Sequence, residues 1–273
     1  MARTLRDALA GSPLPRLECH LLWQAVLGVP RAWLIAHDTD PLDARDLAAY
    51  RALEARRIAG EPMAYILGRR EFWGRDFSVT PDVLIPRPET ELLVECGLRA
   101  VAGVRAPRVL DLGTGSGVVA VSIALDRPDA QVRAVDCSAG ALAVAEMNAR
   151  ALGAKLLFSL GNWYDTQLDS GHYDLIVSNP PYIDSRDSHL VQGDLRFEPR
   201  GALTDGEDGL AALRTIVRGA PAHLLPGGAL CVEHGWDQAA AVRGLFLSSG
   251  FSDVASLRDL ADIERLTWGR LPA

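Results

Sequence analysis

Short apolar runs alternate with helix-like segments from residue 88 to the end of the chain, and this alternation limits the fold more than any other feature. The runs are rich in β-branched residues and bounded by turn residues, which is typical of buried strands. Alternation of this kind predicts a mostly parallel sheet covered by helices on both faces. The seven predicted strands are 108–112, 131–136, 156–160, 173–178, 229–233, 254–257 and 265–270. The predicted helices are 88–102, 116–126, 138–152, 209–223 and 237–249.

The N-terminal part of the chain has a different pattern. Residues 1–70 carry helical periodicity and little strand signal, and glycine and proline divide them into about four or five short helices. In the first long helix, the predicted stripe contains Leu17, His20, Leu21, Gln24, Ala25 and Gly28. A second long helix is predicted at 47–58. The N-terminal part therefore predicts a small α-helical domain.

A short segment joins these two parts. Two aromatic-rich runs flank a glycine turn, which is typical of a β-hairpin, and a proline-rich connector follows. The sequence thus predicts an α-helical domain at 1–70, a β-hairpin and linker at 71–87, and an α/β domain at 88–273.

Composition narrows the class of protein. The 273 residues are 48% hydrophobic and 23% charged, as in an ordinary globular protein, and the net charge of −7 argues against a broad grip on nucleic acid. No apolar run approaches the roughly 20 residues that span a bilayer, and no signal segment is evident. The four cysteines and six histidines are scattered, so no disulfide framework or metal site is predicted. We expect a cytoplasmic monomer without membrane contact.

A glycine-rich turn, Gly113-Thr114-Gly115-Ser116-Gly117, follows the first predicted strand and precedes a helix. In a nucleotide-binding sheet the next strand should end in an acid that accepts hydrogen bonds from ribose hydroxyls, and it ends at Asp136. The ligand could be a dinucleotide or S-adenosylmethionine. The G-x-G-x-G spacing is not the dinucleotide fingerprint, and Asp111 would repel a pyrophosphate but attract a methionyl amino group. The methyl donor is therefore favoured.

A second motif, Ser178-Asn179-Pro180-Pro181-Tyr182, follows the predicted strand 173–178. At the carboxyl edge of an open α/β sheet this position is where ligands bind. Proline donates no N–H, so the turn offers carbonyl oxygens and the Asn179 side chain. Such an acceptor-rich, stiff turn suits a substrate that brings N–H groups, such as an amide or an exocyclic amine.

With both motifs present, the chain resembles the class I, Rossmann-like methyltransferases, and within them the PrmC/HemK family of protein-(glutamine-N5) methyltransferases. The resemblance covers nearly the whole chain. The Asn-Pro-Pro-Tyr turn indicates a chemistry that DNA adenine methyltransferases share. The segment 84–91 and the helical N-terminal part are more specific to the PrmC/HemK family. Further matching segments are 60–68, 71–74, 111–117, 193–199 and 233–235.

The resemblance implies roles for individual residues. The cofactor, S-adenosyl-L-methionine, would contact the glycine turn and the Asn179 turn, with Trp163 beside its adenine. Arg87 and Phe197 would line the substrate entrance. The candidate cofactor-binding residues are Asp111, Gly113, Thr114, Gly115, Ser116, Gly117, Asp136, Trp163 and Asn179. The candidate substrate-binding residues are Asn179, Pro180, Pro181, Tyr182, Arg87 and Phe197, of which Asn179, Pro180 and Tyr182 are the catalytic candidates.

The implied reaction is methylation of the glutamine amide in the Gly-Gly-Gln loop of peptide chain release factors, with the helical domain gripping another part of that substrate. The side-chain oxygen of Asn179 and the carbonyl of Pro180 would accept hydrogen bonds from the substrate NH2, and Tyr182 would pack on the planar amide. No metal is required, because the methylated nitrogen loses its proton readily.

Other functions remain open from the sequence. A methyltransferase acting on an exocyclic amine of DNA or RNA would use the same turn, although the net charge argues against it. A non-catalytic adaptor that kept the nucleotide fold is an alternative of another class. A nicotinamide oxidoreductase is the weakest alternative, because it gives no reason for the proline turn.

Overall fold

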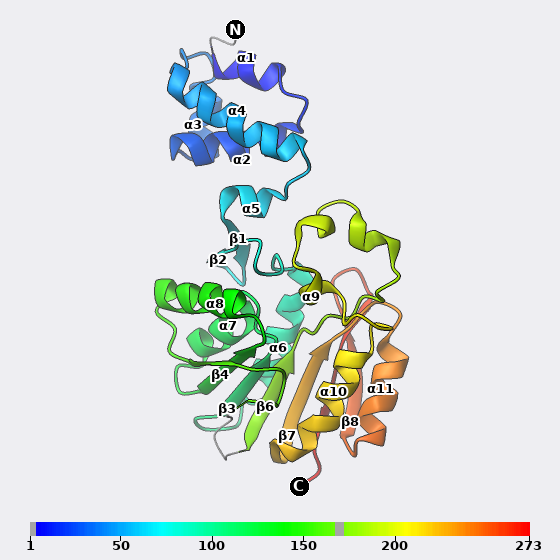
Figure 1. The fold of residues 1–273 in the computed structure, drawn as a ribbon. Coiled ribbons are helices and arrows are strands. Elements are labelled where there is room, and N and C mark those ends of the chain that lie inside the picture. The colour runs from blue at the N-terminus through cyan, green and yellow to red at the C-terminus, as the bar shows by residue number, and fades with distance from the viewer. Residues whose placement is uncertain (1–3, 167–171) are drawn as a thin grey trace. The chain divides into compact units, whose positions relative to one another are not determined.

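The computed structural model describes residues 4–166 and 172–273. The chain divides into two compact units, Met1–Gly68 and Arg69–Ala273 (Figure 1). No helix among the described residues is long and apolar enough to cross a membrane.

The first unit contains five helices within the described residues. Its core is formed by large apolar side chains from several helices, and the ring of Trp23 stacks on that of Tyr50 with centroids 4.3 Å apart. The helices are α1 (Leu5–Ala10), α2 (Arg16–Leu27), α3 (Arg31–Ala36), α4 (Ala44–Ile58) and α5 (Met63–Leu67). The prediction of four or five short helices is confirmed.

The predicted stripe of α2 is buried only in part: His20 is 3% exposed, but other members of the stripe are not buried. Leu17 is 58% exposed and Ala25 is exposed, whereas Cys19, Leu22 and Trp23 are fully buried. Aliphatic residues spaced four apart gave one plausible face, but the large indole of Trp23 packs into the core and turns a different face inward. The burial of a large aromatic ring outweighs that of single aliphatic residues.

The second unit begins with the hairpin β1 (Arg69–Phe72) and β2 (Arg75–Ser78), as predicted. Phe72 and Phe77 are buried in the same core cluster as the helices on one face of the main sheet. That sheet has seven strands in the order β5-β4-β3-β6-β7-β9-β8. They are β3 (Arg108–Leu112), β4 (Gln131–Asp136), β5 (Leu157–Leu160), β6 (Tyr173–Ser178), β7 (Leu224–Glu233), β8 (Ser252–Arg258) and β9 (Glu264–Arg270).

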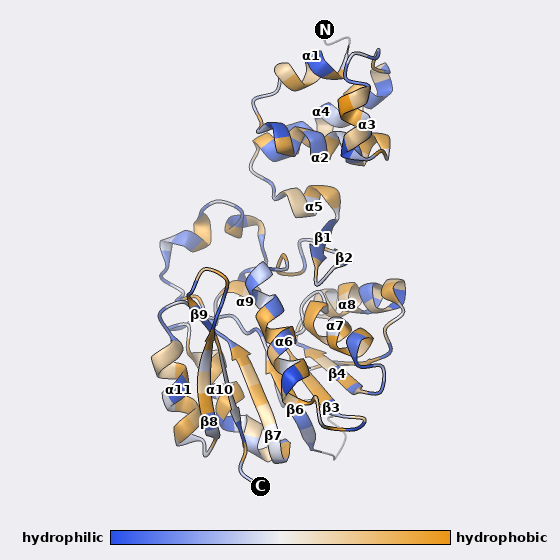
Figure 2. Ribbon diagram, turned by 180° about the vertical axis from the view of Figure 1, so that it is seen from behind, coloured by the Kyte–Doolittle hydropathy of each residue, from blue (hydrophilic) through white to orange (hydrophobic). Residues whose placement is uncertain are grey.

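The first five of these strands pair in parallel, and β9 pairs antiparallel with β7 and β8. The inner strand β7 is strongly apolar, whereas the edge strand β8 is more polar (Figure 2). An apolar inner strand is expected for a sheet covered on both faces. The predicted mostly parallel seven-stranded sheet is confirmed. Strand β7 begins five residues before the predicted start at Ala229, because Leu224 pairs with Tyr173 ahead of a bulge.

Helices cover both faces of the sheet. Residues of α6, α7 and α8 belong to one core cluster, and residues of α10 and α11 belong to the other. The α-helices are α6 (Glu91–Ala100), α7 (Val118–Asp126), α8 (Ala139–Leu152), α9 (Arg200–Leu203), α10 (Ala211–Gly219) and α11 (Ala239–Ser248). The 3-10 turns are η1 (Pro88–Thr90), η2 (Ser188–Val191), η3 (Leu195–Phe197) and η4 (Ala220–Ala222). The carboxyl ends of β3, β4, β5 and β6 meet at one edge of this sheet.

Candidate active site

The glycine turn between β3 and α7 is held by hydrogen bonds inside the protein. The N–H groups of Gly113 and Thr114 both donate to the carbonyl of Val135, at 2.9 and 3.0 Å. The N–H of Gly115 donates to Asp136 Oδ2 at 2.8 Å, and that of Gly117 donates to the Thr114 carbonyl at 2.8 Å. These donors are already used, so the turn does not offer them to a phosphate in the way a dinucleotide-binding turn does.

Glycine is required in this turn for two reasons. The φ angles of Gly113, Gly115 and Gly117 are all positive, at 72°, 56° and 84°. A side chain on Gly113 would also lie 3.2 Å from the indole of Trp163, and one on Gly117 would lie 3.0 Å from the Cβ of Ala145 in α8. The turn is therefore packed closely against both neighbouring segments.

Replacing Gly117 by alanine should destabilise the protein more than the same change at Gly115. Both residues would suffer left-handed strain of about 1–2 kcal/mol, but only the new methyl at Gly117 meets the backbone of α8, adding about 1–3 kcal/mol. Urea denaturation of the two variants measures the difference. Equal losses of unfolding free energy in Gly117→Ala and Gly115→Ala would contradict the close contact.

Two buried carboxyl groups lie at this edge of the sheet. Asp136 is 9% exposed, and its oxygens accept the N–H groups of Gly115 and Ser138. Asp111 is 1% exposed and accepts the Thr114 hydroxyl at 2.7 Å. Burial raises the pKa of Asp136, and it raises that of Asp111 to about 7. A ligand with positive charge would relieve the cost of burying these two groups.

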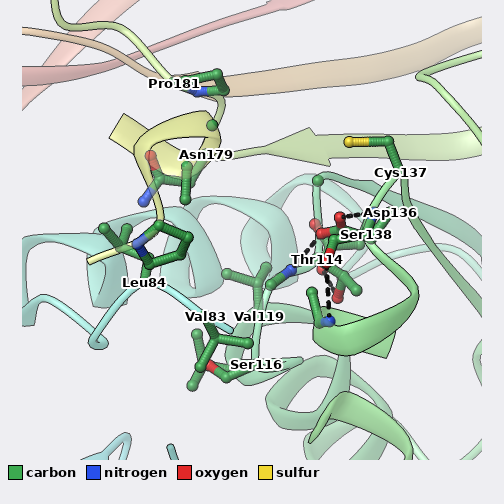
Figure 3. Close-up of a pocket in the computed structure, with 18 of the residues that line it drawn as sticks. Val83, Leu84, Thr114, Ser116, Val119, Asp136, Cys137, Ser138, Asn179 and Pro181 are labelled. Carbon is green, nitrogen blue, oxygen red and sulfur yellow. Dashed lines mark hydrogen bonds between the residues drawn. The ribbon is translucent and has the colours of Figure 1, made fainter. Parts of the chain in front are cut away.

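Both carboxyl groups line a cavity of about 360 Å³ at this edge. Figure 3 shows Asn179 on one side of the cavity and Asp136, Cys137 and Ser138 on another. Of the predicted site residues, the cavity brings together Arg87, Asp111, Gly113, Thr114, Gly115, Ser116, Asp136, Trp163, Asn179 and Pro181.

Four predicted site residues do not line the cavity. Gly117 shapes the turn and precedes α7, and Pro180 is buried beside Asn179. Tyr182 packs against the second core cluster, and its hydroxyl donates to Glu233 Oε1 at 3.2 Å. Phe197 lies under the guanidinium of Arg196, which is 4.9 Å from its ring centroid. The roles of these four residues toward a substrate stay predictions.

Asn179 reaches the cavity in a fixed orientation. Its Nδ2 donates to the hydroxyl of Thr90 at 3.0 Å, and Thr90 is itself 3% exposed. Because this bond occupies one side of the amide, the oxygen Oδ1 is the group left to accept a hydrogen bond from a ligand. The turn thus presents the acceptor that its sequence predicts.

The segment before α6 forms another wall. Arg87 donates to Glu198 Oε1 at 2.5 Å, and the second oxygen of Glu198 accepts the backbone N–H of Ile85 at 3.1 Å. The side chain of Glu198 is fully buried and that of Arg87 is 30% exposed. This pair holds the extended connector and the segment before α9 together.

Several cavity residues were not among the predicted site residues. Some of them lie in the segment 84–91, which the resemblance identifies as specific to the family. The resemblance gave no role to most residues of this segment, so they were not predicted. The missed lining residues are Asp82, Val83, Leu84, Pro86, Thr90, Val118, Val119, Cys137, Ser138, Ala141, Gly161, Asn162, Pro199, Gly201 and Ala202.

The site fits S-adenosylmethionine better than a dinucleotide. The glycine turn keeps its N–H groups for the protein, whereas Asp111 and Asp136 are two buried acceptors with raised pKa values. A sulfonium and an ammonium group would compensate these carboxylates, and a pyrophosphate would repel them. Among residues 4–166 and 172–273, no cluster of three or more His, Cys, Asp or Glu could hold a metal ion.

Known proteins are similar to this chain in sequence and in fold. The sequence matches the PrmC N-terminal domain over residues 2–68 and the methyltransferase small domain over residues 88–196. The release factor glutamine methyltransferase of Bordetella pertussis is 61% identical over 267 residues, which cover 98% of this chain and 99% of that protein.

Solved structures agree in fold. A methyltransferase from Pyrococcus furiosus aligns with a TM-score of 0.57 at 17% identity, over 81% of this chain and 98% of its own. A 16S rRNA methyltransferase of T. thermophilus, solved in complex with AdoMet and guanosine, aligns with a TM-score of 0.54 at 21% identity. That alignment covers 74% of this chain and 49% of the other.

The sheet, the glycine turn and the acid-lined cavity define an S-adenosylmethionine-dependent methyltransferase of the Rossmann-like fold. The helical N-terminal unit, matched as a PrmC N-terminal domain, narrows the class further. The chain belongs to the family of release factor glutamine methyltransferases.

Cofactor affinity should increase with pH up to about 7. Asp111 holds a proton below its raised pKa of about 7, and a cationic ligand favours the ionised form, so binding must expel that proton. Calorimetry at about pH 5.5, 6.3 and 7.0 should show the dissociation constant falling by up to about tenfold per pH unit. In Asp111→Asn the dissociation constant should change less with pH, because only Asp136 then keeps a raised pKa in the cavity, and an unaltered slope in this variant would contradict the assignment.

Proposed function

We propose that this enzyme transfers the methyl group of S-adenosylmethionine to the side-chain amide nitrogen of the glutamine in the Gly-Gly-Gln motif of peptide chain release factors, and so modulates translation termination. The observation that carries the proposal is the orientation of Asn179. Thr90 accepts from its Nδ2, so that Oδ1 is available to a substrate N–H. A planar amide needs such acceptors because its nitrogen lone pair is delocalised into the carbonyl.

In the proposed mechanism, the Asn179 side chain and the Pro180 carbonyl accept hydrogen bonds from the glutamine NH2. These bonds orient the nitrogen and stabilise the positive charge that develops on it. When bound, the cofactor supplies an electrophilic methyl carbon. The amide nitrogen would take the methyl group as the carbon–sulfur bond breaks with its electron pair going to sulfur, and the nitrogen would lose its proton to solvent. We also propose that Tyr182, Pro181, Arg87 and Phe197 shape the substrate entrance.

We further propose that the helical segment 1–70 recognises the release factor, with 71–87 as hairpin and linker and 88–273 as the catalytic domain. Within the helical unit, large apolar side chains are exposed, which is a feature of surfaces that bind proteins. They include Leu17, Trp33, Ile35 and Ile58. The arginines Arg56 and Arg57 on α4 are paired with Glu61 and Glu18, so they do not favour a nucleic-acid partner.

We infer that the enzyme acts as a monomer in the cytoplasm. The thiols of Cys96 and Cys231 share a hydrogen bond at 3.4 Å and form no disulfide, and the thiols of Cys19 and Cys137 are also free of disulfides. Neighbouring thiols stay reduced in a compartment buffered by glutathione or thioredoxin.

Transfer of a labelled methyl group tests the substrate. We expect label on a release factor and none on its variant with the Gly-Gly-Gln glutamine replaced by alanine. Duplex DNA and ribosomal RNA should stay unlabelled at low salt, where non-specific binding is strongest. Label on either nucleic acid, with none on the release factor, would instead support a methyltransferase acting on an exocyclic amine.

A further inference from the structure

The proposed mechanism does not use the buried carboxyl group of Glu233. This group lies near Thr90, the residue that accepts a hydrogen bond from the Asn179 side chain. Glu233 ends strand β7, beside β6 in the sheet, and is 2% exposed. Its Oε1 accepts the Tyr182 hydroxyl at 3.2 Å, whereas its Oε2 is buried without a hydrogen bond. Burial of a charged group with an unpaired oxygen is costly, so this carboxyl needs an explanation.

Thr90 stands between Glu233 and Asn179. Its oxygen accepts Asn179 Nδ2 at 3.0 Å, and its hydroxyl is close enough to Glu233 to stabilise the charged carboxylate. A threonine hydroxyl has a single proton to donate. Because the oxygen already accepts from Asn179, the hydroxyl proton is free to turn toward the Glu233 carboxyl, whose pKa the Thr90 hydroxyl lowers.

We propose that Thr90 and Glu233 are positioning residues for methyl transfer. The Thr90 hydroxyl donates a hydrogen bond to the Glu233 carboxylate, which fixes the Thr90 oxygen as the acceptor for Asn179 Nδ2. The Asn179 Oδ1 is thereby aimed at the substrate amide. This inference rests on the proposed function, because Oδ1 matters only if it holds the glutamine NH2.

The ionisation of Glu233 decides the direction of this chain of hydrogen bonds. An ionised carboxylate accepts from both Thr90 and Tyr182, whereas a protonated carboxyl donates to one of them and competes with Asn179 for the Thr90 oxygen. Burial raises the pKa of Glu233 to about 7, with Glu89 adding to the rise and the Thr90 and Tyr182 hydroxyls and Arg265 opposing it. Arg87 acts on the same cluster by favouring the charged form of Tyr182. Below pH 7, Asn179 should therefore lose its fixed orientation.

The first test replaces Thr90. Thr90→Val keeps the shape of the side chain and removes the acceptor, so kcat on the release factor should fall about 10- to 100-fold. The dissociation constant for S-adenosylmethionine should stay within about twofold, since the contacts at Asp111 and Asp136 are untouched. Thr90→Ser, which keeps the hydroxyl, is the matched control and should restore most of kcat. Unchanged turnover in Thr90→Val would overturn the proposal.

The second test replaces Glu233 by glutamine and follows kcat against pH at saturating cofactor. In the wild-type enzyme, kcat should rise with pH through about 7, because the ionised carboxylate is the productive form. Glu233→Gln should lower kcat about tenfold and abolish this rise. A purely structural role would lower the melting temperature and leave the pH profile in place, which would overturn the inference.

The two tests separate this inference from the proposed function. The wild-type enzyme is first incubated with the release factor and labelled cofactor. If no label appears on the glutamine, the proposed function fails. If the wild type transfers label and both variants do so at its rate and with its pH profile, only the positioning roles fail.

Discussion

Asn179→Ala should lower kcat about 100- to 1000-fold while leaving the affinity for S-adenosylmethionine nearly unchanged. The change removes the acceptor Oδ1 and the bond to Thr90 together, so the substrate nitrogen loses both its orientation and the stabilisation of its developing charge. The candidate cofactor-binding residues Thr114 and Asp136 lie on another side of the cavity (Figure 3) and are unchanged in this variant. Single-turnover methylation of a release factor measures the loss, and calorimetry measures the cofactor affinity.

Gln131→Ala is the matched control, because it removes an exposed amide from the start of β4, at the other end of the strand from the site. This variant should turn over at the wild-type rate. If Asn179→Ala kept a rate near that of the wild type, Asn179 would not be the residue that holds the substrate amide.

Asp136→Ala should weaken cofactor binding by about 100-fold or more. We propose that its carboxylate accepts hydrogen bonds from two ribose hydroxyls, and a hydrogen bond to a charged group contributes about 1.5–3 kcal/mol. The bonds from Gly115 and Ser138 do not prevent this, because a carboxylate has about four acceptor sites. At about 1.4 kcal/mol per factor of ten, two such bonds account for the expected loss. Calorimetric titration with S-adenosylmethionine gives the dissociation constant.

Part of that loss could come from a disturbed glycine turn, since Asp136 also accepts the Gly115 N–H. Asp174→Ala is the control for a general effect on the sheet, because Asp174 accepts the Arg108 N–H at the opposite edge. Its cofactor affinity should equal that of the wild type. An Asp136→Ala variant that bound the cofactor as tightly as Asp174→Ala would exclude ribose binding by Asp136.

The parts of the site that the sequence predicted are those where local chemistry determines structure. Glycine adopts a positive φ at little cost, as at Gly113 and Gly115, so a glycine-rich turn can be identified from the sequence. Asp136 and Asn179 directly end or follow apolar runs, and parallel strands bring their carboxyl ends to one edge. These residues therefore line the cavity together, as predicted.

The predicted stripe of α2 is wrong in part, because the buried face of a helix depends on what packs against it. The stripe through Leu17 and Ala25 is a valid helical face, and nothing local distinguishes it from the face that carries Trp23. The position of Tyr50 in another helix decides between them, through the stacking of the two rings.

The sequence by itself determined the α/β fold, the glycine turn, and the acceptors at Asp136 and Asn179, because each depends on residues adjacent in the chain. Only the tertiary structure brought Thr90 and Glu233 to Asn179, across separations of 89 residues from Thr90 to Asn179 and 51 from Tyr182 to Glu233. The acceptor of the Thr90 hydroxyl is determined by which side chain packs against it. Packing between distant segments cannot be read from local periodicity. The Asn179 turn is thus acceptor-rich by sequence, and its orientation is set by the fold around it.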